Sequence, residues 1–277
     1  MKNNTIISIN GLSFCYKNRS KDESDYWKEI FSDVTFDIKR NQVVGLVGKS
    51  GCGKTTLGKF IVGYFNINKT PIKVDGSVTY TSSDNSKIDI KNKRYKSYRI
   101  PPIQMVFQDP RTSLNMKMNI YDQLYETFKL RFDTLSDTEI NDKIINLMKE
   151  LKIDSLRSKN PSNISGGQRR RFGLAKILAV EPDVIIADEP VASLDVSIKQ
   201  DVMDLLFDIR DRGITIMIIS HDIALLKKNA DMIHVMDQGR LVESWDPNKE
   251  PKHPATIELV HDSNYVNKFI NSITDES

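Results

Sequence analysis

Apolar positions along the chain fall into two kinds of short run. Residues 6–16 and 34–38 alternate apolar and polar side chains, which is typical of strands with one exposed face. The polar, charged stretch between them, residues 17–29, predicts a loop. Other runs are short and continuously apolar, as in strands buried on both faces of a parallel sheet. They cover residues 42–47, 103–107, 184–187, 214–219 and 232–236.

Helical periodicity fills the gaps between these runs. Over residues 138–151 the aliphatic side chains recur on one face, and Ser136 and Glu139 have the spacing of a capping box at the start of such a helix. A second helix is predicted over residues 196–212, where Gly213 ends it. Strands that alternate with helices predict an α/β fold with a mostly parallel sheet.

Two regions depart from this alternation. Residues 109–180 show no strand pattern, so we predict a helical subdomain inserted into the sheet domain. Gly239 and Arg240 lie between two apolar runs and predict a hairpin turn. The expected organisation is one large domain over residues 1–250, which contains the helical insertion, and a C-terminal extension over residues 251–277.

Composition and charge argue against several classes of protein. The 277 residues give a formal net charge of +3 at pH 7, which is too small to indicate nucleic-acid binding. The longest apolar runs have the length of strands, far below the roughly 20 residues that cross a bilayer. The N-terminus lacks the apolar stretch of a secretory signal. Cys15 and Cys52 lack metal-ligand spacing, so we expect a cytosolic, reducing location.

A glycine-rich phosphate loop is the first motif with specific chemistry. It reads Gly48-Lys49-Ser50-Gly51-Cys52-Gly53-Lys54-Thr55 and fits G-x-x-x-x-G-K-[ST] in full, between a predicted strand and a helical run that begins at Thr56. Its glycines let backbone N–H groups wrap phosphates. Lys54 places a charge on the terminal phosphates, and the Thr55 hydroxyl is a ligand for Mg²⁺.

A second phosphate-binding element is predicted at Ser165-Gly166-Gly167-Gln168. Ser-Gly-Gly disfavours a helix interior but suits a helix start, where a hydroxyl and bare N–H groups attract an anion. Two such cradles in one chain imply either two nucleotides or one nucleotide held between two chains.

An acidic pair, Asp188 and Glu189, follows one of the buried apolar runs. In phosphate-loop enzymes an Asp at this strand end holds Mg²⁺. Glu189 can accept a hydrogen bond from the attacking water, and a positioned, polarised water is most of what the protein supplies to hydrolysis. The pair therefore indicates that the nucleotide is hydrolysed.

The order of these motifs resembles that of the ATP-binding-cassette ATPases. It runs from the phosphate loop through Gln108, the Ser-Gly-Gly-Gln signature, the acidic pair and Ser193-Leu194-Asp195 to His221, and the resemblance covers residues 6–244. It implies a RecA-like phosphate-loop core with a mostly parallel sheet, an N-terminal antiparallel β subdomain and an inserted α-helical subdomain. It also implies that two such domains pair head to tail around two ATP molecules.

The resemblance implies a role for each motif residue. The phosphate loop and Thr56 would bind ATP, with Lys54 and Thr55 on its phosphates and Mg²⁺. Asp188 would assist Mg²⁺, and Glu189 would be the catalytic base. Gln108 would contact Mg²⁺ or the water, and His221 would bind the γ-phosphate.

Other implied roles involve the second subunit and the adenine base. The signature, Ser165 and Gly167 above all, would face the phosphate loop of the other subunit, and Asp195 would cross the interface. Tyr16 would stack on adenine, as an aromatic residue near the end of the first strand does in this family. Tyr26 and Trp27 are alternatives for that stacking.

Longer segments narrow the resemblance to the oligopeptide, dipeptide and nickel importer branch. They are residues 103–110, Ser113-Leu114-Asn115, residues 187–198 and Lys252-His253-Pro254-Ala255-Thr256. The branch implies an ATP-binding and ATP-hydrolysing subunit that energises import of peptides, nickel or metal-chelate complexes. Ala255 departs from the tyrosine that the branch has there.

Such a subunit implies partners. They are two transmembrane permease subunits, a second ATPase subunit that is a paralogue or another copy, and an extracytoplasmic solute-binding protein, at the cytoplasmic face of the membrane. Two other readings stay open: a regulatory subunit that binds ATP without hydrolysing it, and a soluble cassette ATPase outside transport. The basic run over residues 87–99 suits a solvated face or a contact with acidic lipid headgroups.

Overall fold

A computed structural model describes residues 4–19, 25–65, 70–91, 95, 98–106, 113–192 and 196–263. The chain forms two compact units. Unit 1 consists of Met1–Tyr98 and Thr215–Ser277, and unit 2 is Arg99–Ile214. Unit 2 is therefore one continuous stretch of chain between the two parts of unit 1.

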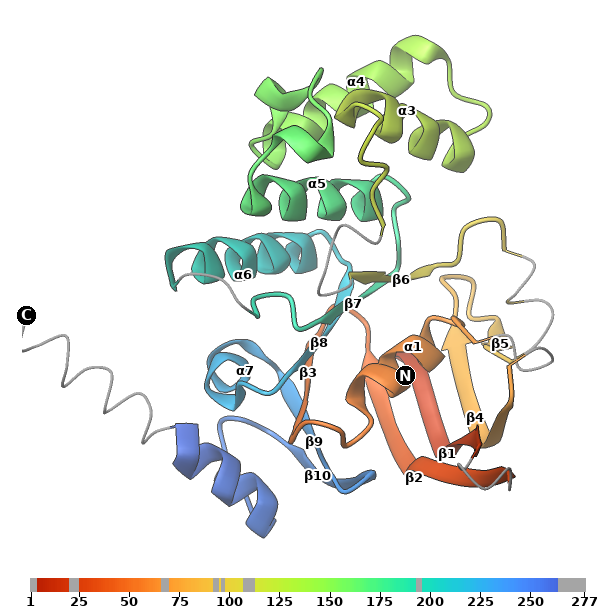
Figure 1. Ribbon diagram of the computed structural model, residues 1–277, viewed down its shortest axis with the longest axis vertical. Helices are drawn as coiled ribbons and strands as arrows, with labels where there is room; N and C mark the ends of the chain where they lie inside the picture. The colour runs from red at the N-terminus through yellow and green to blue at the C-terminus, as the bar shows by residue number, and fades with distance from the viewer. Residues whose placement is uncertain are drawn as a thin grey trace, which may run out of the picture. The chain divides into compact units, whose positions relative to one another are not determined.

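Unit 1 contains an antiparallel sheet with the strand order β2-β1-β4-β5 (Figure 1). Its strands are β1 Thr5–Arg19, β2 Asp25–Lys39, β4 Ile72–Thr81 and β5 Lys87–Asp89. Alternate residues of β1, among them Ile7, Ile9 and Phe14, are fully or almost fully buried. The predicted antiparallel sheet near the N-terminus is confirmed.

The loop predicted over residues 17–29 is wrong, because β1 and β2 extend through most of this stretch as a paired ribbon. Lys17 pairs with Trp27 across the two strands, and both side chains are exposed. A ribbon without a buried face needs no apolar alternation, so its sequence looks like that of a loop. Lys73 from β4 lies over the Trp27 ring, with its Nζ 4.2 Å from the ring centroid.

The parallel strands of unit 1 are centred on β3 Val43–Gly48. It pairs in parallel with β8 Thr215–Ser220 and with β9 Met232–Asp237. Both β3 and β8 are buried along their whole length, as their continuously apolar sequences predicted. Helix α1 Lys54–Ile61 follows β3, α7 Ile223–Asn229 follows β8, and a last helix covers residues 254–263.

The predicted hairpin at the end of unit 1 is confirmed. β10 Arg240–Trp245 pairs antiparallel with β9. The turn residues are Gln238 and Gly239, one position earlier than the predicted Gly239 and Arg240, because Arg240 is the first residue of β10. Their φ values of 45° and 78° are those that tight turns between twisted strands require.

Unit 2 has a parallel strand pair and several helices. β6 Ile103–Val106 pairs with β7 Val184–Asp188. The helices are α3 Ile120–Arg131, α4 Asp137–Glu150, α5 Gly166–Leu178 and α6 Val196–Asp211, with short 3₁₀ turns η2 Asp154–Leu156 and η3 Pro161–Asn163. The described residues from 113 to 180 contain helices and turns and no strand.

The helix predicted over residues 138–151 is confirmed as α4. Ser136 accepts a hydrogen bond from the Glu139 N–H, and the Glu139 carboxylate accepts one from the Ser136 N–H at 2.8 Å, so the predicted capping box is complete. None of the helices formed by the described residues has both the length and the apolar character needed to cross a bilayer.

Candidate nucleotide site

The phosphate loop connects β3 to α1 within unit 1. Gly53 caps α1 with φ 101°, and a Cβ at Gly48 would lie 2.1 Å from the Met236 carbonyl oxygen, so both positions require glycine. Among the described residues, no side chain caps the start of α1, and its first turn contains no acidic residue. A helix start of this kind attracts an anion through its N–H groups.

Lys54 is buried at the base of this loop. Its Nζ donates hydrogen bonds to the carbonyl oxygens of Gly48 at 2.7 Å and Lys49 at 3.1 Å, and it lies 3.7 Å from the Cys52 Sγ. A cavity of about 220 Å³ opens above these groups, lined by Ile30, Gly51, Gly53, Lys54, Thr55 and Thr56. Unit 1 therefore presents a small cradle with a cation at its base and hydroxyl groups in its wall, which suits a polyphosphate.

Tyr16 on β1 is half-buried in an aromatic cluster. Its ring makes edge contacts with Phe14, at a centroid distance of 4.9 Å, and with Phe65, at 6.0 Å. Burial raises the pKa of the Tyr16 hydroxyl, and Tyr64 raises it further. Both alternatives are more exposed, with Tyr26 at 47% and Trp27 at 39% of their surface.

His221 lies immediately after β8, in unit 1, and its side chain is exposed. The next residue, Asp222, caps α7 by accepting a hydrogen bond from the Leu225 N–H at 3.0 Å. The strand end and this cap fix the backbone on both sides of His221.

The acidic pair lies at the end of β7 in unit 2. Asp188, the last residue of the strand, is 6% exposed. Glu189 has φ 48°, a left-handed conformation that is uncommon for a residue with a side chain. Its carbonyl accepts a hydrogen bond from the Ala192 N–H at 3.2 Å, which closes a turn. A buried carboxylate thus precedes a second carboxylate held in a strained turn, a geometry for which the sequence gives no signal.

The Ser-Gly-Gly-Gln signature forms the start of α5 in unit 2, as predicted. Ser165 accepts a hydrogen bond from the Gln168 N–H at 3.3 Å, and the Gln168 Oε1 accepts one from the Ser165 N–H at 3.0 Å. A Cβ at Gly166 would meet no described atom within 4 Å, so no contact with the described residues explains glycine there. The first turn is open and lacks acidic side chains.

The predicted site residues that the structure describes thus form two groups, one in each unit. The phosphate loop, Tyr16 and His221 belong to unit 1, and the acidic pair and the signature belong to unit 2. Gln108 and Asp195 lie outside the described residues.

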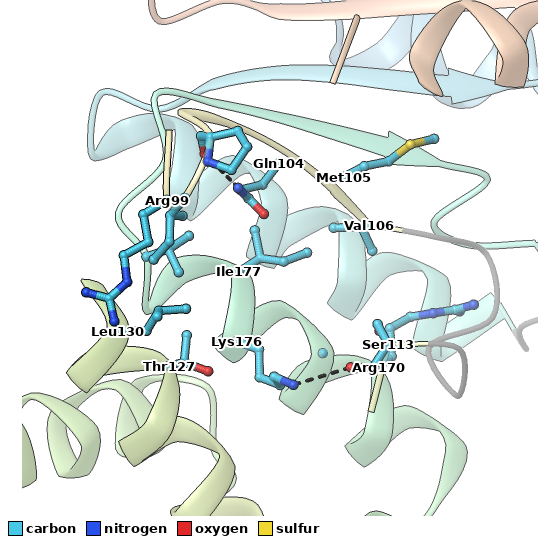
Figure 2. A pocket seen from close by; sticks show the side chains of 14 residues that line it. Arg99, Gln104, Met105, Val106, Ser113, Thr127, Leu130, Arg170, Lys176 and Ile177 are labelled. Atoms are coloured by element: carbon cyan, nitrogen blue, oxygen red, sulfur yellow. Dashed lines mark hydrogen bonds between the residues drawn. The ribbon is translucent and has the colours of Figure 1, made fainter. Parts of the chain in front are cut away.

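Unit 2 also contains an apolar pocket of about 390 Å³ that the sequence did not predict (Figure 2). β6, the end of α3 and one face of α5 form its walls, with Met105, Val106, Leu130 and Ile177 among the apolar residues. Lys176 lies at its edge, where its Nζ donates to the Ser113 carbonyl at 3.3 Å. Burial lowers the pKa of Lys176, and Glu126 partly opposes this effect.

A phosphate cradle after one buried parallel strand and an acidic pair after another are the arrangement of a phosphate-loop nucleoside triphosphatase. The comparisons with known proteins define the class further. The family model described as ABC transporter matches residues 31–192. The chain belongs to this family, as an ATP-binding-cassette ATPase.

Individual relatives agree with this assignment. The chain is 34% identical to the oligopeptide transport ATP-binding protein OppF of Streptococcus mutans, over 92% of this chain and 80% of the relative. It is 36% identical to a putative peptide import ATP-binding protein of Brucella ovis, over 94% and 79%. Among solved structures, cbiO1 of Clostridium perfringens, part of the ABC transporter complex cbiONQ, is similar with a TM-score of 0.70 and 29% identity over 89% of this chain and 90% of that one.

A further solved structure supports the fold alone. The ATP-binding cassette MJ0796, solved as a dimer bound to ADP and Pi, is similar with a TM-score of 0.71 and 21% identity over 88% of this chain and all of that one. The predicted RecA-like α/β fold is confirmed by these structures together with the parallel strand pairs of both units.

Proposed function

We propose that this chain is the ATP-hydrolysing subunit of an importer for peptides. The observation that carries the proposal is the phosphate cradle of unit 1. The chain also has the acidic pair and the signature helix start, and it aligns over 92% of its length with OppF of Streptococcus mutans. The relatives are named for oligopeptide and peptide import, and this favours peptides over nickel or metal chelates as the solute.

The residues of the cradle fit MgATP. Lys54, buried beneath the loop, supplies the charge for the β- and γ-phosphates, and the Thr55 hydroxyl is an oxygen ligand of the kind that Mg²⁺ prefers. The Asp188 carboxylate of unit 2 would assist Mg²⁺. In this proposal Glu189 is the catalytic base. Mg²⁺, when bound, neutralises charge that develops on the phosphates.

Three other residues complete the proposed chemistry. Gln108 contacts Mg²⁺ or the attacking water, His221 contacts the γ-phosphate, and Tyr16 stacks on adenine. The partly buried ring of Tyr16, held by its aromatic neighbours, supports that choice over the more exposed Tyr26 and Trp27, because a fixed ring loses less entropy on stacking.

The second subunit completes each site. We expect Ser165 and Gly167 to face the ATP held by the other subunit, with Asp195 across the interface. The open space around Gly166 and the absence of acids in the described first turn of α5 support a ligand from outside the chain at this helix start.

Permease subunits supply the membrane path in this proposal, and the chain works at the cytoplasmic face. The apolar pocket of unit 2 is where we expect a permease segment to dock. Ser113 lines this pocket, and it lies within residues 108–119, the segment for which the resemblance implies the permease contact. An extracytoplasmic binding protein delivers the solute to the assembled complex.

Replacing Leu130 by Asp should separate docking from ATP binding. Leu130 lines the pocket and leaves 42% of its surface exposed, so a carboxylate there would have to be desolvated against a permease segment. We expect association with the permease pair in detergent to weaken at least ~10-fold, with unchanged ATP binding. Leu130→Met is the matched control and should associate normally. Equal co-purification of the Asp variant would contradict this docking site.

Uptake measurements test the function itself. Cells that lack this chain should fail to accumulate a labelled oligopeptide and should recover with the wild-type gene, but not with a Glu189→Gln variant. Parallel uptake of radioactive nickel distinguishes the alternative solute. Normal uptake of both the oligopeptide and nickel in the deleted strain would overturn the assignment as an importer subunit. It would favour the alternative hypothesis of a soluble cassette ATPase outside transport.

A further inference from the structure

The helix over residues 254–263 is firmly attached to unit 1 at its start. The Glu243 carboxylate on β10 accepts hydrogen bonds from the Lys252 N–H at 2.9 Å and the His253 N–H at 3.1 Å. Thr256, in the first turn of the helix, is fully buried. The helix therefore has a defined position on the core of unit 1.

One turn further on, this helix contacts the phosphate loop. The Glu258 Oε1 accepts a hydrogen bond from the Lys49 Nζ at 2.8 Å, and Lys49 is the second residue of the loop. The Glu258 contact raises the pKa of Lys49, and the nearby Asp237 and Asp262 raise it further. The charge of Lys49 is therefore paired with a carboxylate, in an ion pair whose side chains are 58% and 54% exposed.

Lys49 also connects this contact to the cation of the site. Its carbonyl oxygen accepts a hydrogen bond from the Lys54 Nζ, which also donates to the Gly48 carbonyl. Glu258 thus binds the side chain of Lys49, and the Lys49 carbonyl in turn binds Lys54. The helix therefore contacts the part of the loop at which the proposed function places the phosphates of ATP.

We propose that the C-terminal helix is an electrostatic brake on nucleotide binding, in which Glu258 places a negative charge beside the phosphate loop and neutralises Lys49. The inference rests on the proposed function of the loop as the ATP site. ATP carries several negative charges, so an unpaired Lys49 at the edge of its cradle would favour binding, and the Glu258 carboxylate beside Lys49 cancels that attraction. Glu258 is in this sense a positioning residue that acts through Lys49.

A charge-neutral variant tests the brake. Glu258→Gln should bind MgATP and MgADP about two- to fivefold more tightly than the wild-type chain at low salt, a size typical of exposed ion pairs. The gain should shrink towards zero at about 1 M salt, where the Debye length falls to roughly 3 Å. Glu250→Gln is the matched control, because Glu250 is an exposed acid just before the same helix, and it should leave the affinity unchanged.

A double-mutant cycle of ATP affinities distinguishes an electrostatic role of Glu258 from a purely structural one. Lys49→Gln should weaken MgATP binding by a similar factor in the wild-type background, because the Glu258 carboxylate is then left uncompensated beside the loop. The double variant, which lacks both charges, should return to about the wild-type affinity. Titration of the full-length chain with a fluorescent ATP analogue measures all four affinities. Thermal unfolding of each variant checks that the fold is kept.

Several outcomes overturn the brake. They are a Glu258→Gln affinity equal to or weaker than that of the wild type, a gain that high salt does not reduce, or a double variant that keeps the full gain of Glu258→Gln. A wild-type chain that binds ATP but shows one of these results refutes the brake alone. A wild-type chain that binds no ATP refutes both the brake and the proposed function.

Discussion

A Glu189→Gln variant is expected to bind ATP with an affinity within about twofold of wild type and to hydrolyse it at least ~100-fold more slowly. The amide keeps the shape of the carboxylate, so the turn after β7 and the buried Asp188 before it should be retained. It cannot accept the proton of an attacking water. Phosphate release by the assembled ATPase gives the rate, and nucleotide titration gives the affinity.

A matched substitution controls for the backbone. Glu181 is also a glutamate at positive φ, 49°, in unit 2, and its carboxylate is exposed in an ion pair with Lys143 at 3.0 Å. Glu181→Gln should hydrolyse ATP at the wild-type rate. Normal turnover in Glu189→Gln would refute the assignment of the base, whereas loss of ATP binding in that variant would point to a structural role.

The second large effect is expected from Ser165→Arg. The long cation would fill the open first turn of α5, and the Ser165 cap would be lost, so the ATP site of the neighbouring subunit should fail. We expect hydrolysis to fall at least ~100-fold, as for other displacements of groups around reacting atoms. Binding of ATP to the variant's own phosphate loop should persist. Ser162→Arg, an exposed position just before the signature, is the control for added charge.

Mixing two inactive variants tests whether sites are shared. Lys54→Ala has a defective phosphate loop and an intact signature, and Ser165→Arg has the reverse. In a pair of identical chains, random mixing should restore about a quarter of the activity, because half the dimers are mixed and each has one complete site. Restoration identifies two copies as the working pair. Full-rate hydrolysis by Ser165→Arg alone, or by isolated monomers, would show that the site is complete within one chain.

The phosphate loop and the helix starts could be predicted from sequence because local chemistry determines them. Only glycine fits at Gly48 and Gly53, and the capping pair at Ser136 and Glu139 satisfies backbone groups through adjacent side chains. The exposed ribbon of β1 and β2 was missed, since residues with no buried face show no periodicity. Short-range signals are thus reliable where the backbone, rather than distant packing, selects the residue.

Contacts between distant parts of the chain left no trace in the sequence. Lys49 and Glu258 are 209 positions apart, and each is an ordinary surface charge in its own segment. The pocket of unit 2 combines side chains from β6, α3 and α5, none of which shows a local motif. The left-handed backbone of Glu189 was equally invisible, because glutamate has no preference for it.

The turn at Glu189 places stability and chemistry in opposition at a single residue. A left-handed backbone favours glycine or asparagine, and holding a longer side chain there costs on the order of 1 kcal/mol. Selection for a sturdier fold would therefore favour loss of the carboxylate, while selection for turnover favours its retention. A glutamate at this position is what a working ATPase would require, and a lineage freed from ATP hydrolysis would have a thermodynamic reason to replace it.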